Sequence, residues 1–289
     1  MMSEVAVRFW QPAPQEGTDL VCAYLEAGRA RAHLHEEWQF AVPESPAKLS
    51  VGAFRRYTVH PADLTIIPPY HVHTEGGGPE PTPNWRVLYV APTLLGRVRL
   101  GSSGISAHEV SRPLVPILPD PPAANELRGL LEASERGDID GPEFLVRALR
   151  WLEQLLDRHA AEVAIPTRVP AVERARRYLE DRATHPVSLS EVGAVAGVTV
   201  SHLVRSFSRT VGLPPKSYHA QVRLARARRL LAQGKSATWV AYECGFADQS
   251  HLSRRFKECY GLTPGAFQDQ YHSPSRSPAR LAGVASNAA

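Results

Sequence analysis

One short stretch near the carboxyl end carries side chains that can read DNA bases, at a spacing that turns them to one face of a helix. Over residues 249–260, Leu252, Phe256 and Tyr260 recur every four residues and are expected to face a core. The polar residues between them then face outward. Arginine can bind guanine through two hydrogen bonds, glutamine can bind adenine, and serine suits a phosphate or a base edge. The candidate DNA contacts of this helix are Gln249, Ser250, His251, Arg254 and Lys257.

The same pattern occurs a second time, at an offset of 48 residues before its turn and 49 after it. Gly197 matches Gly245, and the repeated dipeptide Ser-His before a leucine keeps the register unambiguous. A single pattern of this kind is weak evidence, whereas a tandem pair is strong. Val204 is placed to touch a thymine methyl group. The candidate DNA contacts of the first copy are Ser201, Val204, Arg205 and Ser208.

Each copy has the features of a helix-turn-helix unit. Ser236, Asp248 and Thr263 are expected to cap successive helices of the second copy, and Ser188 with Glu191 forms a capping box in the first. Between the copies, residues 216–232 contain neither Pro nor Gly and predict a helix. At about 1.5 Å per residue it spans roughly 25 Å, which brings the recognition helices near the ~34 Å of one DNA turn. The spacing predicts binding in two successive major grooves.

These residues resemble the AraC/XylS family of transcription regulators. The resemblance covers about residues 170–271 closely and the N-terminal part loosely. It implies a seven-helix DNA-binding domain behind a cupin-like domain that binds an effector. The matching motifs are Arg223-Leu224-x-x-Ala227-x-x-Leu230-Leu231, Gly245-Phe246-x-x-Gln249-Ser250-His251-Leu252-Ser253-Arg254-x-Phe256 and Gly261-Leu262-Thr263-Pro264.

A second group of residues with binding chemistry lies near the N-terminus. Alternation along a strand at residues 33–40 puts His33, His35, Glu37 and Gln39 on one face, opposite Trp38 and Phe40. A further histidine, His73, follows a proline turn. The set is similar to the two cupin motifs, with Gln39 where a metal-binding cupin has its acid. A metal ion, a small organic effector and a solvated strand face are the three interpretations. We expect an organic effector bound by the three histidines and Gln39, and neither a metal nor another cofactor.

Charge and composition divide the chain into parts with different tasks. The net charge is +4, but residues 168–289 hold 18 Lys and Arg against 8 Asp and Glu, a net +10, whereas residues 1–167 have a net −6. Basic charge gathered in one domain indicates contact with a polyanion there. Short β-like segments between Leu20 and Leu118 predict a sandwich or small barrel, with 75–84 as a loop.

The predicted fold class is α+β with two domains, an N-terminal cupin-like β-barrel and an all-α DNA-binding domain with two helix-turn-helix units. A leucine stripe at 145, 149, 152 and 156, on a helix expected at 142–159, either pairs with its twin in a dimer or packs on its own barrel. The predicted parts are 1–120 (effector-binding domain), 121–160 (helical dimerisation or packing segment), 161–170 (linker), 171–272 (DNA-binding domain) and 273–289 (disordered tail).

Two other function classes compete with a regulator. One is a metal-dependent cupin enzyme, a dioxygenase or isomerase, using His33, His35 and His73, with the helical domain as an appendage. The other is a DNA-architectural protein without an effector. The basic charge and the tandem motif argue for a non-enzymatic regulator. Three scattered cysteines fit a reducing compartment, so the expected location is the cytoplasm. The expected partners are double-stranded DNA, a small-molecule effector, a second copy of the chain and, for an activator, RNA polymerase; no membrane is expected.

Overall fold

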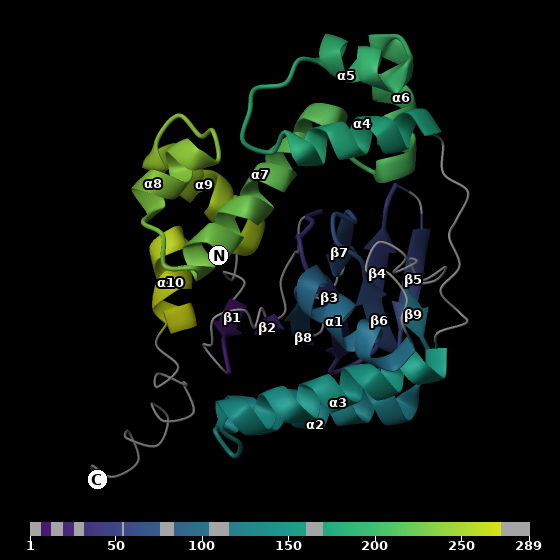
Figure 1. Ribbon diagram of the computed structural model, residues 1–289, viewed down its shortest axis with the longest axis vertical. Helices are drawn as coiled ribbons and strands as arrows, with labels where there is room; N and C mark the ends of the chain where they lie inside the picture. Colours follow the sequence, from purple (N-terminus) through teal and green to yellow (C-terminus); the bar gives the residue numbers. More distant parts are fainter. Residues whose placement is uncertain are drawn as a thin grey trace.

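The structure is a computed structural model that describes residues 7–12, 20–25, 32–53, 55–75, 84–103, 116–159 and 170–272. An N-terminal part rich in β-strands is followed by an all-helical C-terminal part (Figure 1). The predicted α+β order is therefore confirmed. The predicted tail at 273–289, and the predicted linker apart from Pro170, lie outside the described residues.

Nine strands of the N-terminal part form two antiparallel sheets within the described ranges. The three-stranded sheet has the order β5 (Arg55–Val59), β4 (Ala47–Val51) and β7 (His73–Glu75). The predicted β-rich N-terminal domain is confirmed, and no backbone pairing between its described strands joins the two sheets into a closed barrel. The six-stranded sheet has the order β1 (Val7–Trp10), β2 (Leu20–Leu25), β8 (Trp85–Val90), β3 (Trp38–Pro43), β6 (Leu64–Ile67) and β9 (Ile117–Leu118).

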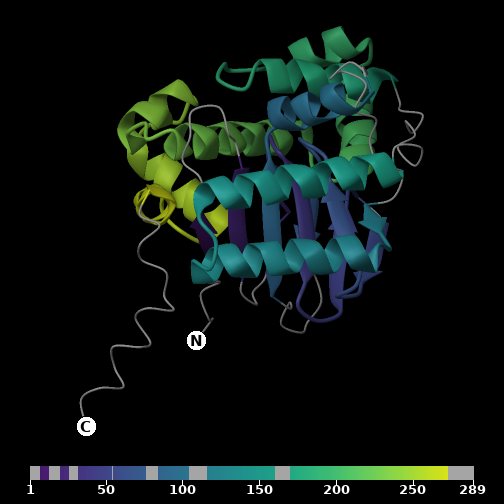
Figure 2. The ribbon, with the colours of Figure 1, turned by 60° about the horizontal axis from the view of Figure 1, so that its bottom comes forward.

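The larger sheet is buried on both faces because its strands alternate between two cores. Trp38 and Phe40 of β3 join Leu88 in a cluster beneath the helices α1 (Pro92–Ser103), α2 (Pro121–Arg136) and α3 (Gly141–His159). Figure 2 shows α2 and α3 running side by side across this face. Gln39 alternates to the opposite face, as its position predicted.

Only part of the predicted leucine stripe of α3 packs on the sheet. Phe144, Ala148, Trp151, Leu152 and Leu155 are buried there, and the indole N–H of Trp151 donates to the carbonyl of Ala123 at 3.0 Å. Leu145, Leu149 and Leu156 are half-buried on the flank of the same cluster. The helix thus packs on its own domain, and whether its flank also meets a second copy stays a prediction.

Two segments of the N-terminal part differ from the sequence expectation. The strand expected from His33 begins only at Trp38. His33 instead forms an isolated bridge with His73, and the chain bends at residues 36 and 37 before the strand starts. Glu75, expected at the start of a loop, is the last residue of β7 and is buried. The helix α1 was not predicted, since Gly and Arg dilute its apolar pattern.

Seven helices form the C-terminal part of the described chain, as the resemblance implied. Ser188, Ser236, Asp248 and Thr263 cap helices as predicted, with Ser188 and Glu191 completing a capping box. In Figure 1, α7 connects one unit containing α4 to α6 with a second containing α8 to α10. The helices are α4 (Pro170–Asp181), α5 (Leu189–Ala196), α6 (Val200–Val211), α7 (Pro215–Ala232), α8 (Ala237–Glu243), α9 (Gln249–Tyr260) and α10 (Pro264–His272).

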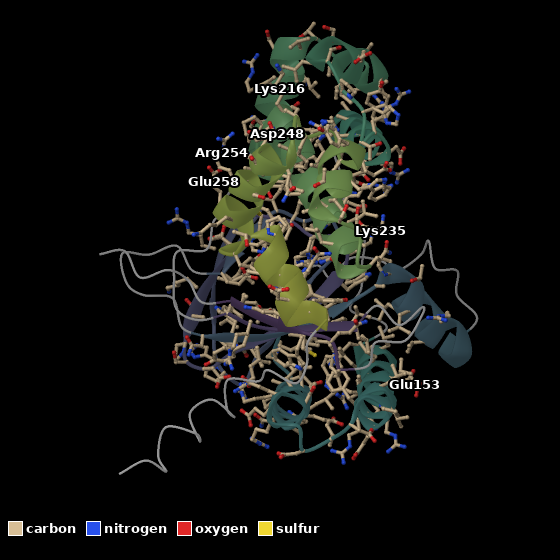
Figure 3. All side chains as sticks on the ribbon, turned by 90° about the vertical axis from the view of Figure 1, so that its left-hand side faces the viewer. Glu153, Lys216, Lys235, Asp248, Arg254 and Glu258 are labelled. Carbon is tan, nitrogen blue, oxygen red and sulfur yellow. The ribbon has the colours of Figure 1, made fainter. Side chains whose placement is uncertain are left out.

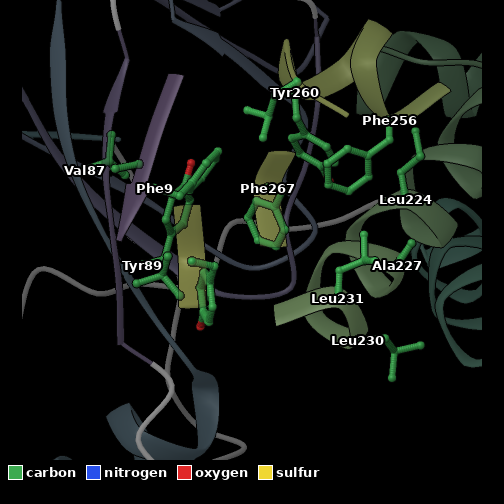
Figure 4. Close-up of a cluster of buried hydrophobic side chains, with 14 of the residues drawn as sticks. Phe9, Val87, Tyr89, Leu224, Ala227, Leu230, Leu231, Phe256, Tyr260 and Phe267 are labelled. Carbon is green, nitrogen blue, oxygen red and sulfur yellow. The ribbon is translucent and has the colours of Figure 1, made fainter. Parts of the chain in front are cut away.

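Both helix-turn-helix units pack directly on the β-rich domain. Figure 4 shows the cluster in which Phe9 and Tyr89 meet Leu224 and Phe267 from the helices. The rings of Phe9 and Phe267 are 5.2 Å apart, edge to face, and the amide N–H of Phe9 donates to Gln270 Oε1 at 3.2 Å. The first unit buries Leu34 and Val72 of the N-terminal part in its own core. The two domains therefore share hydrophobic cores.

Candidate DNA-binding surfaces and effector site

The second recognition helix, α9, presents its predicted contacts to solvent. Leu252, Phe256 and Tyr260 are buried, and Gln249, Ser250, Arg254 and Lys257 are exposed. Figure 3 shows Arg254 projecting from this helix. The hydroxyl of Thr238 on α8 donates to Gln249 Oε1 at 2.7 Å, which orients the amide group of Gln249. The side-chain NH₂ of Gln249 can then donate a hydrogen bond to a base.

His251, also predicted to contact DNA, makes several contacts with residues next to it in the chain. Its ring lies 5.4 Å from that of Phe246, edge to face. Its Nδ1 accepts from the amide of Ala247 at 3.5 Å, and its own amide donates to the cap residue Asp248 at 2.7 Å. These contacts hold the start of α9, so His251 has a clear structural role besides its predicted one.

The first recognition helix, α6, repeats the arrangement with a weaker polar face. Ser201 and Arg205 are exposed, and Val204 and Ser208 are half-buried. Arg205 follows the buried Leu203 by two residues and precedes the buried Phe207 by two, as Arg254 does between Leu252 and Phe256. Neither arginine forms a hydrogen bond or ion pair with a described residue, so both guanidinium groups are free to bind a ligand.

The turn of each unit is held by an arginine from the preceding long helix, a feature the sequence interpretation did not identify. Arg174 donates to the carbonyl of Ala196 at 2.5 Å, and Arg223 donates to the carbonyl of Gly245 at 2.5 Å. A Cβ on Gly245 would lie 1.8 Å from Arg223 Nη2, which explains glycine there. The offset of 49 from Arg174 to Arg223 was the available signal. Arg223 is thus structural.

Two further arginines of α7 pair with the β-rich domain. Arg228 is buried, forms an ion pair with Glu37 and lies 4.6 Å over the ring of Tyr89. Burial opposes its charge, but the Glu37 carboxylate outweighs burial and holds the pKa of Arg228 above its ordinary value. Arg229 pairs with Glu36 at 2.5 Å. Arg226 lies 3.9 Å from Glu243 and is the α7 arginine that remains a candidate for phosphate contact.

The predicted effector residues do come together, although their strand is interrupted. The ring of His73 lies 4.4 Å from that of His33 and 4.9 Å from that of His35. Gln39 Oε1 is 3.3 Å from His73 Nε2, and the amide group of Gln39 donates to Glu75 Oε1 at 2.8 Å. Glu75, which was not among the predicted residues, therefore belongs to this site. Its period-2 spacing from His73 was the signal that could have found it.

Burial and opposite charge set the protonation of this group. Burial alone would raise the pKa of Glu75, but the imidazoles of His73 and His33 outweigh it and hold the pKa well below the ordinary range. Burial would lower the pKa of His73, but Glu75 raises it above its ordinary value. Burial, with His73 next in effect, lowers the pKa of His35 well below its ordinary value. The site thus holds a neutral His35 beside a buried His73–Glu75 pair.

The turn between these histidines touches α7 directly. Tyr70 has a positive φ of 59°, a strained conformation for a large side chain. Its amide donates to the carbonyl of His35 at 2.8 Å, and its own carbonyl lies 3.2 Å from the hydroxyl of Tyr218 on α7. A short chain of hydrogen bonds therefore links the effector residues to the connecting helix.

Comparison with known families agrees with an effector-binding domain followed by a helix-turn-helix domain. The model of the AraC-like ligand binding domain matches residues 23–153, and that of a helix-turn-helix domain matches 192–270. An uncharacterized HTH-type transcriptional regulator, YbfI of Bacillus subtilis (strain 168), is 26% identical over 224 residues, covering 76% of this chain and 80% of its own. The arabinose operon regulatory protein of Salmonella typhimurium is 25% identical over 230 residues, covering 74% and 76%.

A solved structure has the same arrangement of domains. ToxT of Vibrio cholerae strain SCE256, with a bound unsaturated fatty acid, matches 93% of this chain and 96% of its own with a TM-score of 0.54. At 13% identity, this similarity shows the fold alone. None of the helices in the described ranges is both long and apolar enough to cross a bilayer.

Proposed function

The chain belongs to the AraC/XylS family of transcription regulators, and we propose that it reads DNA with Arg205 and Arg254 under the control of a small molecule bound beside His35. The observation that carries the proposal is the matched pair of recognition helices. Each presents an exposed arginine, without a partner among the described residues, between a buried leucine and a buried phenylalanine. A solvated surface alone would not require the same arginine in both copies.

The connecting helix sets the distance between the two recognition helices. At about 1.5 Å per residue, the 18 residues of α7 span roughly 27 Å, and the two units lie at its opposite ends (Figure 1). The separation supports binding in two successive major grooves of one monomer. In each groove the arginine would bind guanine through two hydrogen bonds, Gln249 an adenine, and the serines and Lys257 the backbone.

Effector control follows from contacts that bridge the domains. His35 is followed by Glu36 and Glu37, and these pair with Arg229 and Arg228 of α7. A ligand that moves His35 changes the position of both carboxylates, and α7 carries a recognition helix at each end. The ligand therefore biases the relative placement of the recognition helices through its different affinity for the two arrangements. Replacing His35 with Ala should abolish the effector response and leave basal DNA binding intact.

The flank of α3 supports a proposal about the oligomeric state. The half-buried leucines at 145, 149 and 156, beside an exposed Val146, support a homodimer through the flank of α3. Changing both Leu149 and Leu156 to Glu should then yield monomers. RNA polymerase is the further partner if the chain activates transcription. We place the protein in the cytoplasm and assign it no catalytic activity.

The test is selection of binding sites from random double-stranded DNA by the full chain. The proposal expects two recurring half-sites whose centres are about 10 base pairs apart, each with a guanine contacted by one arginine. Binding with no preferred sequence would indicate an architectural protein instead. Enrichment of a single half-site would contradict the two-groove arrangement.

A further inference from the structure

Three side chains of the kinds that hold transition metals meet inside the effector domain. One ligand atom from each of His33, His73 and Glu75, a ring nitrogen or a carboxylate oxygen, lies within 4.8 Å of the other two. The side chains of His73 and Glu75 are 0% and 2% exposed, and that of His33 is 12% exposed. These three residues are called the His-Glu cluster below.

The backbone fixes the His-Glu cluster before any ligand arrives. His33 and His73 form an antiparallel bridge, each donating its amide N–H to the carbonyl of the other at 3.0 Å. Glu75 follows His73 by two positions on β7, so both side chains project from the same face. The arrangement is therefore set by strand geometry and not by rotamers of exposed side chains.

The distances between these atoms suit one small cation. His73 Nε2 is 3.1 Å from Glu75 Oε1, and His33 Nε2 is 3.8 Å from Glu75 Oε2. Ligands bound to zinc at about 2.0 to 2.1 Å in a tetrahedron are about 3.3 Å apart. Small side-chain rotations would bring these separations to that value.

The hydrogen bonds of the histidines direct their lone pairs into the site. His73 Nδ1 donates to the carbonyl of His71 at 2.9 Å, so its Nε2 faces Glu75 and the side-chain oxygen of Gln39. A neutral His73 would place that lone pair against two oxygen acceptors. A cation between them removes the conflict, and Gln39 orients the carboxylate by donating to it at 2.8 Å.

Two buried atoms here lack a hydrogen-bond partner among the described residues. One is Glu75 Oε2 and the other is His35 Nε2. His35 is 1% exposed, and its Nδ1 donates to the carbonyl of Glu37 at 2.6 Å. Its ring lies 4.9 Å from that of His73, beside the His-Glu cluster. Buried polar atoms are seldom left unpaired, and a bound ion is one way to satisfy them.

We propose that the His-Glu cluster binds one divalent transition-metal ion such as Zn²⁺, with the ring of His35 beside it. Two imidazoles and a carboxylate favour Zn²⁺, Fe²⁺ or Ni²⁺ over Mg²⁺ or Ca²⁺. A position left open by three protein ligands would take an oxygen or nitrogen of the effector. Binding of the effector to the metal rests on the proposed function, whereas metal binding itself does not. The sequence interpretation, which expected no metal, took the acid to be missing at Gln39; Glu75 supplies it from another strand.

The test measures Zn²⁺ binding to the untagged full chain after removal of metals with a chelator. Titration calorimetry should give one Zn²⁺ per chain, and Co²⁺ should produce visible absorption bands of a nitrogen- and oxygen-bound ion. Glu75→Gln and His33→Gln should each weaken Zn²⁺ binding by more than about tenfold, since even loss of an outer partner costs that much. The controls Glu44→Gln and His60→Gln, remote from the His-Glu cluster, should bind Zn²⁺ as the wild type does.

Two results would overturn the metal site. One is the absence of stoichiometric Zn²⁺ binding to folded wild-type protein, which would leave a protonated His73 as the cation. The other is unchanged affinity in both Glu75→Gln and His33→Gln, with circular dichroism showing that both fold. Site selection on DNA separates this proposal from the proposed function. A chain that selects an operator but binds no Zn²⁺ loses only the metal, and one that binds Zn²⁺ without selecting DNA loses only the regulator.

Discussion

The guanidinium of Arg228, on the helix that joins the two DNA-binding units, is buried against the carboxylate of Glu37 in the effector domain. The side chains are 4% and 12% exposed, so water contributes little to either charge. Removal of one partner from a buried pair leaves an uncompensated charge, which costs about 3 to 5 kcal/mol. Loss of either partner from this pair should therefore weaken the contact between the domains.

We predict that Glu37→Leu and Arg228→Met each lower stability by about 3 to 5 kcal/mol, and that the double variant loses less than the sum. Urea unfolding of the full chain measures these differences. The control is the neighbouring pair of Glu36 and Arg229, whose arginine is 40% exposed. Glu36 is 11% exposed, but solvent reaches the guanidinium of Arg229, so Arg229→Met should cost less than Arg228→Met. Equal losses for Arg228→Met and Arg229→Met would argue against a special role for the buried pair.

A close approach of two glycines gives a second prediction about the same domain contact. Gly212, at the end of α6, has a φ of 92°, and a Cβ there would lie 2.7 Å from the carbonyl carbon of Gly52. Gly137 has a φ of 75° with nothing within 4 Å of its Cβ position. Both alanine variants suffer left-handed strain of about 1 to 2 kcal/mol, but only Gly212→Ala must also push two backbones apart. Its melting temperature should fall further than that of Gly137→Ala, and equal shifts would contradict the contact.

The start of α2 provides a test based on pH. Asp120 accepts from the amide of Ala123 at 2.9 Å and from His159 at 2.8 Å. Burial alone would raise the pKa of Asp120, but these hydrogen bonds and the charge of Arg158 lower it. Because the pKa is lowered in the folded state, the ionised carboxylate stabilises the fold at pH values above the ordinary Asp pKa of about 3.9. That stabilisation is lost as the pH falls through the pKa of the folded state.

Replacing Asp120 with Ala should cost about 1 kcal/mol at pH 7, as loss of a helix cap does. Asp120→Asn keeps a capping oxygen and removes the charge, so it should cost less than Asp120→Ala. The difference in melting temperature between wild type and Asp120→Asn should shrink as the pH drops below about 4. A difference that stays constant as the pH falls well below 4 would show that the charge of Asp120 does not stabilise the fold.

The helical domain was more predictable from sequence than the β-rich domain. Its signals are local, since capping residues, turn glycines and a four-residue period each act within a few positions. Ser188, Asp248 and Thr263 consequently cap helices as expected. The strands depend on distant partners. His33 alternates with His35 as a strand would, yet its backbone forms an isolated bridge with His73 and the strand starts five residues later, at Trp38.

The candidate site was predicted in part for the same reason. His33, His35, Gln39 and His73 were identified from spacing and come together, but Glu75 and the partners on α7 were not. Glu75 was assigned to the glycine-rich stretch that follows it, although its strand brings it beside His73. Arg228 was not singled out from the sequence, and only the packing of the two domains shows that Glu37 pairs with it. Contacts across a domain boundary have no short-range signal.

The central claim is that Arg254 reads a base, and the most direct measurement is selection of binding sites with Arg254→Ala and Arg255→Ala. Arg255 is the matched control because it lies on the same helix, is exposed and pairs with Glu258 at 2.8 Å. Arg254→Ala should weaken binding by about 1 to 3 kcal/mol and relax the preference at one base pair only. We expect a smaller loss for Arg205→Ala, and a uniform loss across all sequences for Arg226→Ala, which at most contacts phosphate. If Arg254→Ala keeps the wild-type preference at every position while affinity falls uniformly, Arg254 holds phosphate and the account of base reading is wrong.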